Sequence, residues 1–140
     1  MVRRAVEAGA TVVAGGKPVD PGFFYEPTLL TGAAPGSEIA QEEIFGPVLV
    51  VLPFDDEDEA VRIANDSIYG LSGAVHSRDQ ERAVALARRI RTGTLSINGG
   101  NYFASDVPFG GFKQSGLGRE RGVPGFEEFL ESKAYAVVEA

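Results

Sequence analysis

The chain has 140 residues, no cysteine and a formal net charge of −7 at pH 7. Its length suits a single globular domain, and a composition of 44% hydrophobic and 24% charged residues is ordinary for such a chain. The acidic balance argues against nucleic acid and anionic membranes as partners, and no apolar run approaches the ~18 residues that a membrane span needs.

The absence of cysteine excludes disulfides, thiolate metal sites and a cysteine nucleophile within these residues. His76 is the single histidine, and a zinc site needs several histidine or cysteine ligands, so we expect no metal. His76 also falls in a predicted strand, where a satisfied or solvent-facing histidine is the ordinary interpretation. No basic and then apolar signal peptide opens the chain, so the simplest expected location is cytoplasmic.

The first part of the chain predicts short, mixed elements. Residues 2–8 suit the end of a helix that stops at Gly9, and residues 11–14 suit a strand. The helix begins abruptly, with no capping residue ahead of it, so we expect the chain to be cut from something longer. Residues 23–30 are aromatic and β-prone and predict an irregular hairpin or edge segment. Ser37 is expected to cap a short helical turn.

An acidic pair and an apolar run follow. Residues 48–52 are all apolar and lie between Pro47 and Pro53, a pattern typical of a strand buried on both faces of a parallel sheet. Glu42 and Glu43 precede this strand and are therefore expected in a loop. A pair of glutamates is ordinarily a solvated loop feature.

Two helices have clear boundary signals. Residues 55–59 are all acidic and suit the first turn of a helix, where they offset its positive end. A calcium loop is disfavoured, because the glycine and the distant glutamate of such a loop are absent. Ser77 and Gln80 form a capping-box pattern for the second helix, which Gly93 is expected to end.

Residues 72–77 and 94–97 predict further strands. Strands and helices therefore alternate with short joints, which predicts an α/β fold with a layered parallel sheet and right-handed crossovers. Ligands of such sheets bind at the carboxyl ends of the strands, and Asn98 opens that edge.

Residues 99–121 form a long glycine-rich loop, and loops of this kind are often functional. The loop is not a phosphate cradle. Lys113 falls inside the glycine spacing of a P-loop instead of ending it, and Gly122 comes one place too late for the dinucleotide fingerprint.

The end of the chain predicts a helix and a strand. Residues 125–132 suit a short amphipathic helix with Phe126, Phe129 and Leu130 directed inward. Residues 134–138 suit a strand with nothing after it to cover its edge, and such an edge invites pairing with another chain.

Several motif segments occur in one order along the chain: residues 42–47 (EEIFGP), 69–72 (YGLS), 93–98 (GTLSIN), 108–120 (PFGGFKQSGLGRE) and 125–133 (GFEEFLESK). Together they resemble the aldehyde dehydrogenase superfamily, and specifically the C-terminal third of such a chain. The resemblance implies that residues 1–132 are the second half of the family's catalytic domain. It implies that residues 133–140 are a C-terminal oligomerisation strand, and hence a homo-oligomer.

The resemblance also implies a cofactor contact. In the family, the second glutamate of the EEIFGP motif accepts hydrogen bonds from the ribose next to nicotinamide, and here that residue is Glu43. One carboxylate can bridge two vicinal hydroxyls with charge-assisted bonds. Phe45 would pack near the nicotinamide ring, although it could equally be a core aromatic. The implied cofactor is NAD or NADP.

Further roles follow from the same resemblance. Glu120 matches a glutamate implicated in proton relay to the deacylating base, although a salt bridge with Arg119 or Arg121 is an equal alternative. Phe109 could also be a core aromatic. The residues that match the family's aldehyde tunnel are Gly99, Gly100, Phe103 and Phe109.

The family oxidises a small-molecule aldehyde to a carboxylic acid. Its chemistry needs a cysteine that forms a thiohemiacetal, hydride transfer to nicotinamide, and a glutamate-activated water. The cysteine, the base and the dinucleotide-binding half match nothing here, and the residues that select the aldehyde and NAD over NADP belong to those missing parts. The isolated chain is therefore expected to be inactive. The alternative is a truncated, non-catalytic oligomerisation or interaction module, and an independent nucleotide-binding domain is disfavoured by the failed glycine motifs.

Overall fold

The computed structural model describes residues 1–101 and 103–138. Contacts within the chain divide it into two compact units, Met1–Ser67 and Ile68–Ala140, and each is described by itself. The sequence-based division at residues 132 and 133 stays a prediction. No helix among the described residues is both long enough and apolar enough to cross a membrane.

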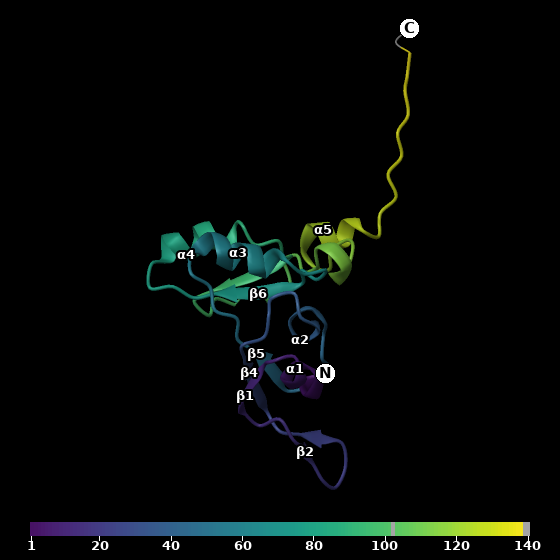
Figure 1. Cartoon of the computed structure of the whole chain (residues 1–140). Helices are drawn as coiled ribbons and strands as arrows, with labels where there is room; N and C mark the ends of the chain where they lie inside the picture. The colour runs from purple at the N-terminus through teal and green to yellow at the C-terminus, as the bar shows by residue number, and fades with distance from the viewer. Residues whose placement is uncertain (102, 139–140) are drawn as a thin grey trace. The chain divides into compact units, whose positions relative to one another are not determined.

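The elements of the first unit follow the predicted order of helices and strands, except that residues 28–31 form the central strand of the sheet where an irregular hairpin or edge segment was expected (Figure 1). In chain order they are α1 (Val2–Glu7), β1 (Thr11–Ala14), β2 (Pro18–Val19), β3 (Phe24–Tyr25), β4 (Thr28–Thr31), α2 (Glu38–Gln41), β5 (Val48–Val50) and α3 (Glu57–Asn65).

The sheet of the first unit is mixed, so the predicted all-parallel sheet is not confirmed. Strand β1 pairs with β4 in antiparallel register, and β4 pairs with β5 in parallel register. The direction of each pair follows from its connection. The β2–β3 hairpin returns the chain from β1 to β4 without a crossover helix, whereas α2 lies between β4 and β5 and permits a parallel return.

The core of the first unit lies on one face of this sheet. Leu30 on β4 has no exposed surface and packs in a cluster with Ala5, Ala10 and Ile39. Apolar side chains that pack against this cluster while keeping some exposed surface are Met1, Val2, Ala33, Ile44, Val48 and Val50.

The prediction that residues 48–52 are buried on both faces is wrong. Side chains alternate across a strand, so Val48 and Val50 reach the core while Leu49 points to the opposite face. Leu49 is 63% exposed and Val51 45% exposed. No element of this unit covers that second face.

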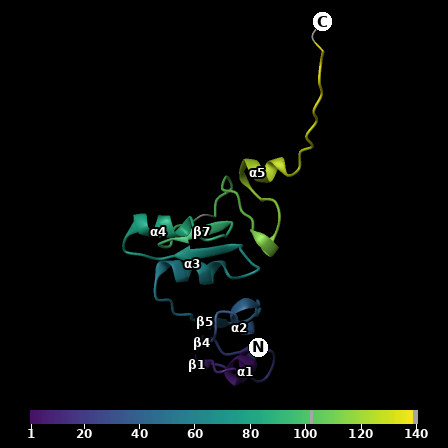
Figure 2. The same ribbon diagram turned by 45° about the horizontal axis from the view of Figure 1, so that its top comes forward.

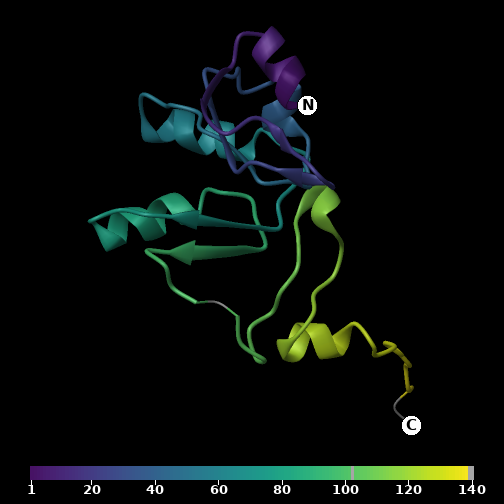
Figure 3. The same cartoon turned by 90° about the horizontal axis from the view of Figure 1, so that it is seen from below.

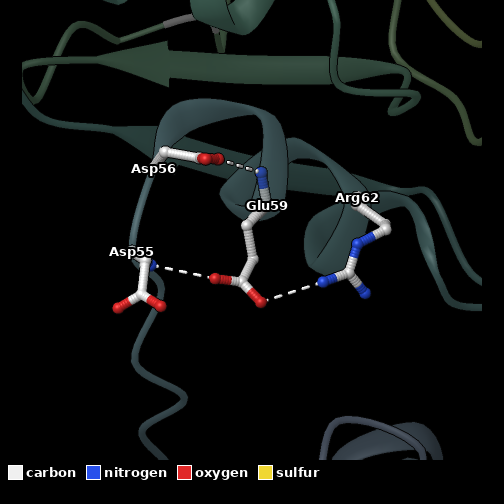
Figure 4. A network of polar contacts seen from close by, with 4 residues as sticks. All are labelled: Asp55, Asp56, Glu59 and Arg62. Carbon is white, nitrogen blue, oxygen red and sulfur yellow. Dashed lines mark hydrogen bonds and ion pairs between the residues drawn. The ribbon is translucent and has the colours of Figure 1, made fainter.

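The acidic run of residues 55–59 begins α3, as predicted from helix electrostatics. The backbone N–H of Glu59 donates to Asp56 Oδ1 at 2.8 Å, which caps the helix (Figure 4). The Glu59 carboxylate accepts from the Asp55 backbone N–H at 2.9 Å and from Arg62 Nη2 at 2.9 Å. The bond to Asp56 satisfies an amide that helix formation leaves without a partner, and the two bonds of the Glu59 carboxylate hold the first turn against its flanking residues.

The second unit is built on a parallel strand pair. Its elements are β6 (Ser72–Val75), α4 (Gln80–Ala87), β7 (Thr94–Ile97), the 3₁₀ turn η1 (Lys113–Ser115) and α5 (Gly122–Glu127). Strands β6 and β7 run side by side in parallel register (Figure 3), and α4 connects them and packs along them (Figure 2). The core between helix and strands consists of Val75, Ala83 and Ala87, with Leu86, Ile90, Leu95 and Ile97 packed around it.

The cap of α4 differs from the prediction. Asp79 occupies the capping position and its Oδ1 accepts from the Arg82 backbone N–H at 3.0 Å. Ser77 instead accepts from the backbone N–H of Asp79 at 3.2 Å. A carboxylate closer to the first turn therefore replaces the predicted capping box.

The C-terminal predictions are only partly met. Helix α5 spans Gly122–Glu127, so it covers only the start of the predicted range 125–132 and ends before Phe129 and Leu130. The inward direction predicted for these apolar side chains is wrong, since Phe126, Phe129 and Leu130 are 65%, 88% and 57% exposed. The chain after α5 has no helix or strand as far as Val138 (Figure 1), so the predicted strand at residues 134–138 is not confirmed. A strand needs a hydrogen-bonded partner, and none is present among the described residues.

An ion pair joins α1 to α2. The Arg4 guanidinium donates to both carboxylate oxygens of Glu38, at 2.8 and 2.5 Å. The hydrogen bonds from Arg4 hold the pKa of Glu38 below its usual value, and the same bonds raise the pKa of Arg4. Because the folded pKa of Glu38 lies below the unfolded one, the pair stabilises the first unit at neutral pH, and that stabilisation is lost as the pH falls through the folded pKa.

Truncating the buried leucine of β4 should destabilise the chain strongly. We expect Leu30→Ala to lower the free energy of unfolding by about 2–5 kcal/mol, because it leaves a cavity in the core. Leu49→Ala on the adjacent strand is the matched control and should cost no more than about 0.5 kcal/mol, since its side chain is mostly exposed. Urea unfolding of the three chains measures both values. Equal losses of unfolding free energy in the two variants would contradict a core that lies on only one face of the sheet.

Removing the Glu38 charge should change the pH dependence of stability. At pH 7 the Glu38→Gln chain should melt below the wild-type chain, and the difference should shrink as the pH is lowered from about 5 to about 2. Glu7→Gln is the control, because Glu7 lies 3.6 Å from Arg3 in an exposed pair and should have little effect at any pH. A melting difference for Glu38→Gln that stays constant down to pH 2 would show that the charge is not its cause.

Candidate functional site

The loop of residues 42–47 connects α2 to β5 and is held at both of its ends. The backbone N–H of Glu42 donates to the Glu38 carbonyl at 2.9 Å, and the N–H of Thr28 on β4 donates to the Pro47 carbonyl at 2.8 Å. Between these points Ile44 packs against the core cluster. The loop is therefore fixed by the first unit's own core, which leaves its other side chains available.

Glu43 and Phe45 flank Ile44 and both are exposed. The Phe45 ring is 89% exposed, so the alternative that it is a core aromatic is wrong for this chain. Its φ of +53° is in the left-handed region, which non-glycine residues rarely adopt and which occurs preferentially at functional sites. Glu42 is exposed as well, so exposure alone does not distinguish the two glutamates.

In the second unit, the predicted site begins at the carboxyl end of β7. Asn98 and Gly99 have φ values of +50° and +81° and reverse the chain there. The Asn98 side-chain oxygen accepts from the Ser77 backbone N–H at 2.9 Å, which ties the end of β7 to the segment after β6. Ser96 Oγ donates to the Gly100 carbonyl at 2.8 Å. Gly99 and Gly100 thus form an exposed turn at the edge where ligands of parallel strands bind.

Three residues of the following loop form what we call the aromatic cluster: Phe103, Phe109 and Arg121. The two rings meet edge to face, with centroids 6.1 Å apart and an interplanar angle of 71°. The Arg121 guanidinium carbon lies 3.6 Å from the centroid of the Phe103 ring. Phe109 is half-buried, whereas Phe103 is 59% exposed.

The backbone of Glu120 is held beside this cluster. Phe109 and Glu120 exchange two backbone hydrogen bonds, of 2.8 and 2.7 Å, in an antiparallel bridge. The Glu120 side chain is exposed and forms no salt bridge with Arg119 or Arg121, so that alternative is not realised among the described residues. The structure therefore places the backbones of Glu120 and Phe109 side by side.

Arg119 has a different environment from Arg121. Its Nη1 donates to the Gly111 and Gly118 carbonyls at 3.0 and 2.6 Å, and its guanidinium lies 5.4 Å from the Phe112 centroid. Its backbone N–H donates to Glu128 Oε1 at 3.2 Å. Arg119 therefore ties the glycine-rich loop to itself and to the segment after α5.

An open pocket of about 330 Å³ lies within the second unit along this loop. Apart from backbone glycines and Arg119, its lining residues are Leu71, Phe109, Ser115, Leu117, Glu120 and Glu128. Glu128 and Arg121 were not expected as site residues. The cation above Phe103 comes from a residue 18 positions away in the sequence, and no periodicity or motif spacing predicts such a contact.

The glycines of three motif segments pack backbone against backbone in the second unit. Gly70 accepts through its carbonyl from the N–H groups of Gly93 and Phe112, at 3.0 and 2.8 Å. A Cβ on Gly93 would overlap the Gly110 carbonyl, and one on Gly70 would lie 2.6 Å from the Arg91 carbonyl oxygen. The contacts explain why these positions are glycine. They also bring the YGLS, GTLSIN and PFGG segments together around the loop that carries the aromatic cluster.

Within the part of the chain that is described, no group of three or more histidine, cysteine, aspartate or glutamate side chains is placed to hold a metal ion.

The chain is similar in sequence to dehydrogenases. A relative from Pseudomonas sp., 3-succinoylsemialdehyde-pyridine dehydrogenase, is 50% identical over 137 residues, which are 95% of this chain and 28% of that protein. Betaine aldehyde dehydrogenase of Bacillus subtilis is 48% identical over 137 residues, which are 94% of this chain and 28% of that protein. Both are dehydrogenases by name.

A solved structure and a family model agree with these relatives. Betaine aldehyde dehydrogenase from Staphylococcus aureus, solved in complex with NAD⁺, matches with a TM-score of 0.86 and 47% identity over 92% of this chain and 27% of that one. The model of the aldehyde dehydrogenase family matches residues 1–135. The chain belongs to the aldehyde dehydrogenase family, and it spans about 28% of the length of the relatives it matches.

Proposed function

We propose that the chain is the C-terminal portion of an NAD(P)-dependent aldehyde dehydrogenase that oxidises a small-molecule aldehyde to a carboxylic acid. The observation that carries the proposal is the family match over residues 1–135 of a chain that spans 28% of its relatives. Relatives of this family include a structure in complex with NAD⁺, which supports a nicotinamide cofactor for the complete enzyme.

Glu43 and Phe45 are the proposed cofactor contacts, and their surroundings fit that role. The Glu43 carboxylate is exposed on a loop that is anchored on either side, so it can accept bonds from two neighbouring hydroxyls of a ribose without rearranging. Phe45 offers an uncovered ring two positions away, suited to a flat heteroaromatic group. When bound, the nicotinamide supplies the hydride acceptor.

The aldehyde pocket is proposed to be lined by Gly99, Gly100, Phe103 and Phe109. The two glycines end β7 at the carboxyl edge, and the two rings form an apolar wall by their edge-to-face contact. Such walls exclude water and orient a small organic substrate.

Glu120 is proposed to relay a proton at this pocket. Two backbone hydrogen bonds to Phe109 hold its backbone, and its carboxylate forms no salt bridge with a described residue. A carboxylate in that position can accept a proton and pass it on to solvent.

Residues 134–138 are the proposed oligomerisation strand. Tyr135, Val137 and Val138 are 84%, 81% and 93% exposed, which leaves apolar side chains uncovered in the single chain. Pairing with a second copy would cover them and complete the strand. The same exposure favours the second candidate function, a non-catalytic interaction module.

The cytoplasmic location stays a prediction.

The isolated chain should oxidise no aldehyde. It has no cysteine, and no other side chain in it supplies an equivalent nucleophile. The measurement is NAD(P)H formation by the purified 140-residue chain with short aliphatic and aromatic aldehydes. Turnover that survives repurification would contradict the proposal.

A chimera tests the positive half of the proposal. The chimera is Bacillus subtilis betaine aldehyde dehydrogenase in which this chain takes the place of the segment that it matches. This chimera should oxidise an aldehyde and form NADH or NADPH. In the chimera Glu43→Gln should lower kcat/KM for the dinucleotide about ten-fold to a hundred-fold, because it removes charged hydrogen bonds worth roughly 1.5–3 kcal/mol.

Glu42→Gln is the matched control, since it changes the neighbouring exposed carboxylate and should have little effect. The loss at Glu43 should be the same with every aldehyde, because a ribose contact does not touch the substrate. If the two glutamine variants behave alike, Glu43 is only a solvated loop residue.

A further inference from the structure

Arg121 occupies an unusual position at the aromatic cluster. Its guanidinium carbon is 3.6 Å from the Phe103 centroid, and Phe103 in turn meets Phe109 edge to face. A guanidinium that lies over a ring is attracted by the ring's negative face and held there. The contact therefore fixes a positive charge against one wall of the proposed aldehyde pocket.

The charge of Arg121 is not neutralised within the described residues. No carboxylate among them forms an ion pair with Arg121, whereas Arg119 directs its Nη1 at two backbone carbonyls. Arg121 is also partly buried. Of the two arginines of the loop, Arg121 is thus the one whose donors are available to a ligand.

The backbone of Arg121 is held in an uncommon conformation. Its φ is +64°, and the residues on either side are tied down: Glu120 by the bridge to Phe109, and Gly122 by donating to the Ser105 carbonyl at 3.1 Å. A strained non-glycine residue persists only where its surroundings determine it, and such residues cluster at ligand-binding sites. The side chain is accordingly presented from a fixed point.

We propose that Arg121 is a specificity-determining residue that selects aldehydes carrying a second, remote carboxylate, which departs from the expectation that the residues selecting the aldehyde all lie in the missing parts. The inference rests on the proposed function, which makes Phe103 and Phe109 walls of the aldehyde pocket. A planar guanidinium matches a carboxylate with two parallel hydrogen bonds, and its stacking on Phe103 orients it before the substrate arrives. The reacting aldehyde group is not touched by Arg121.

The same contact disfavours cationic aldehydes. A quaternary ammonium group binds proteins through the faces of aromatic rings. In this chain one face of Phe103 is already covered by Arg121, and the guanidinium repels a second positive charge. The substrate preference should therefore run from anionic through neutral to cationic aldehydes.

The first arm of the test uses the chimera and three aldehydes: 4-oxobutanoate, butanal and trimethylammonioacetaldehyde. Arg121→Gln should lower kcat/KM about ten-fold or more for 4-oxobutanoate, leave it within about two-fold for butanal, and raise it for the cationic aldehyde. Arg88→Gln changes an exposed arginine after α4 and should alter none of the three values. Equal losses with all three aldehydes, or no change with any, would overturn the proposal.

The second arm needs no turnover and uses the 140-residue chain itself. Titration with butanoate should shift the side-chain Nε–H resonance of Arg121, and titration with butanamide should not. The Arg88 resonance is the internal control. Equal shifts at both arginines would mean non-specific anion binding, and no shift at Arg121 would mean no carboxylate site, so either result overturns the proposal. A chimera that oxidises none of the aldehydes would count against the proposed function, and this second arm then decides the role of Arg121.

Discussion

The second unit depends on backbone contacts that only glycine permits. Gly70, Gly93 and Gly110 come from three separate segments, and any Cβ there would meet a carbonyl group or a neighbouring side chain at less than contact distance. Because Gly70 also accepts two backbone hydrogen bonds, the long loop after β7 is attached to the segment before β6. The positions of Phe109, Glu120 and Arg121 follow from this attachment. The glycines of the motifs are therefore part of how the site is built, although none of them needs to contact a ligand.

The first unit uses a different device to present its loop. A single apolar residue, Ile44, enters the core, while its neighbours Glu43 and Phe45 stay outside. Loops usually vary in conformation unless such anchors hold them, and here the anchor lies inside the motif itself. Ile44 thus supports the fold, which leaves Glu43 and Phe45 exposed for the contacts proposed for them.

Local patterns predicted most of the elements, because helix ends and strands depend on nearby residues. The helix after Asp56, the strands at residues 11–14 and 94–97, and the glycine-rich loop were all visible in the sequence. Strand direction and exposure were not. The antiparallel β1–β4 pair depends on a hairpin that the sequence only suggested, and the exposure of Leu49 and Phe126 depends on which surfaces the chain itself provides. For the proposed site, the family resemblance named Phe109 and Glu120, and the structure places their backbones side by side. The stacking of Arg121 on Phe103 is instead a tertiary contact without a local signal.

The division of the chain between Ser67 and Ile68 has a consequence for how such sequences diversify. The loop of residues 42–47 belongs entirely to the first unit, and the aromatic cluster belongs entirely to the second. Recombination between related genes at this junction would exchange the two loops as intact blocks, without cutting either core or separating the three contacting glycines. Each block could then accumulate substitutions under its own selection, so the proposed cofactor contacts and the proposed aldehyde pocket need not share one line of descent.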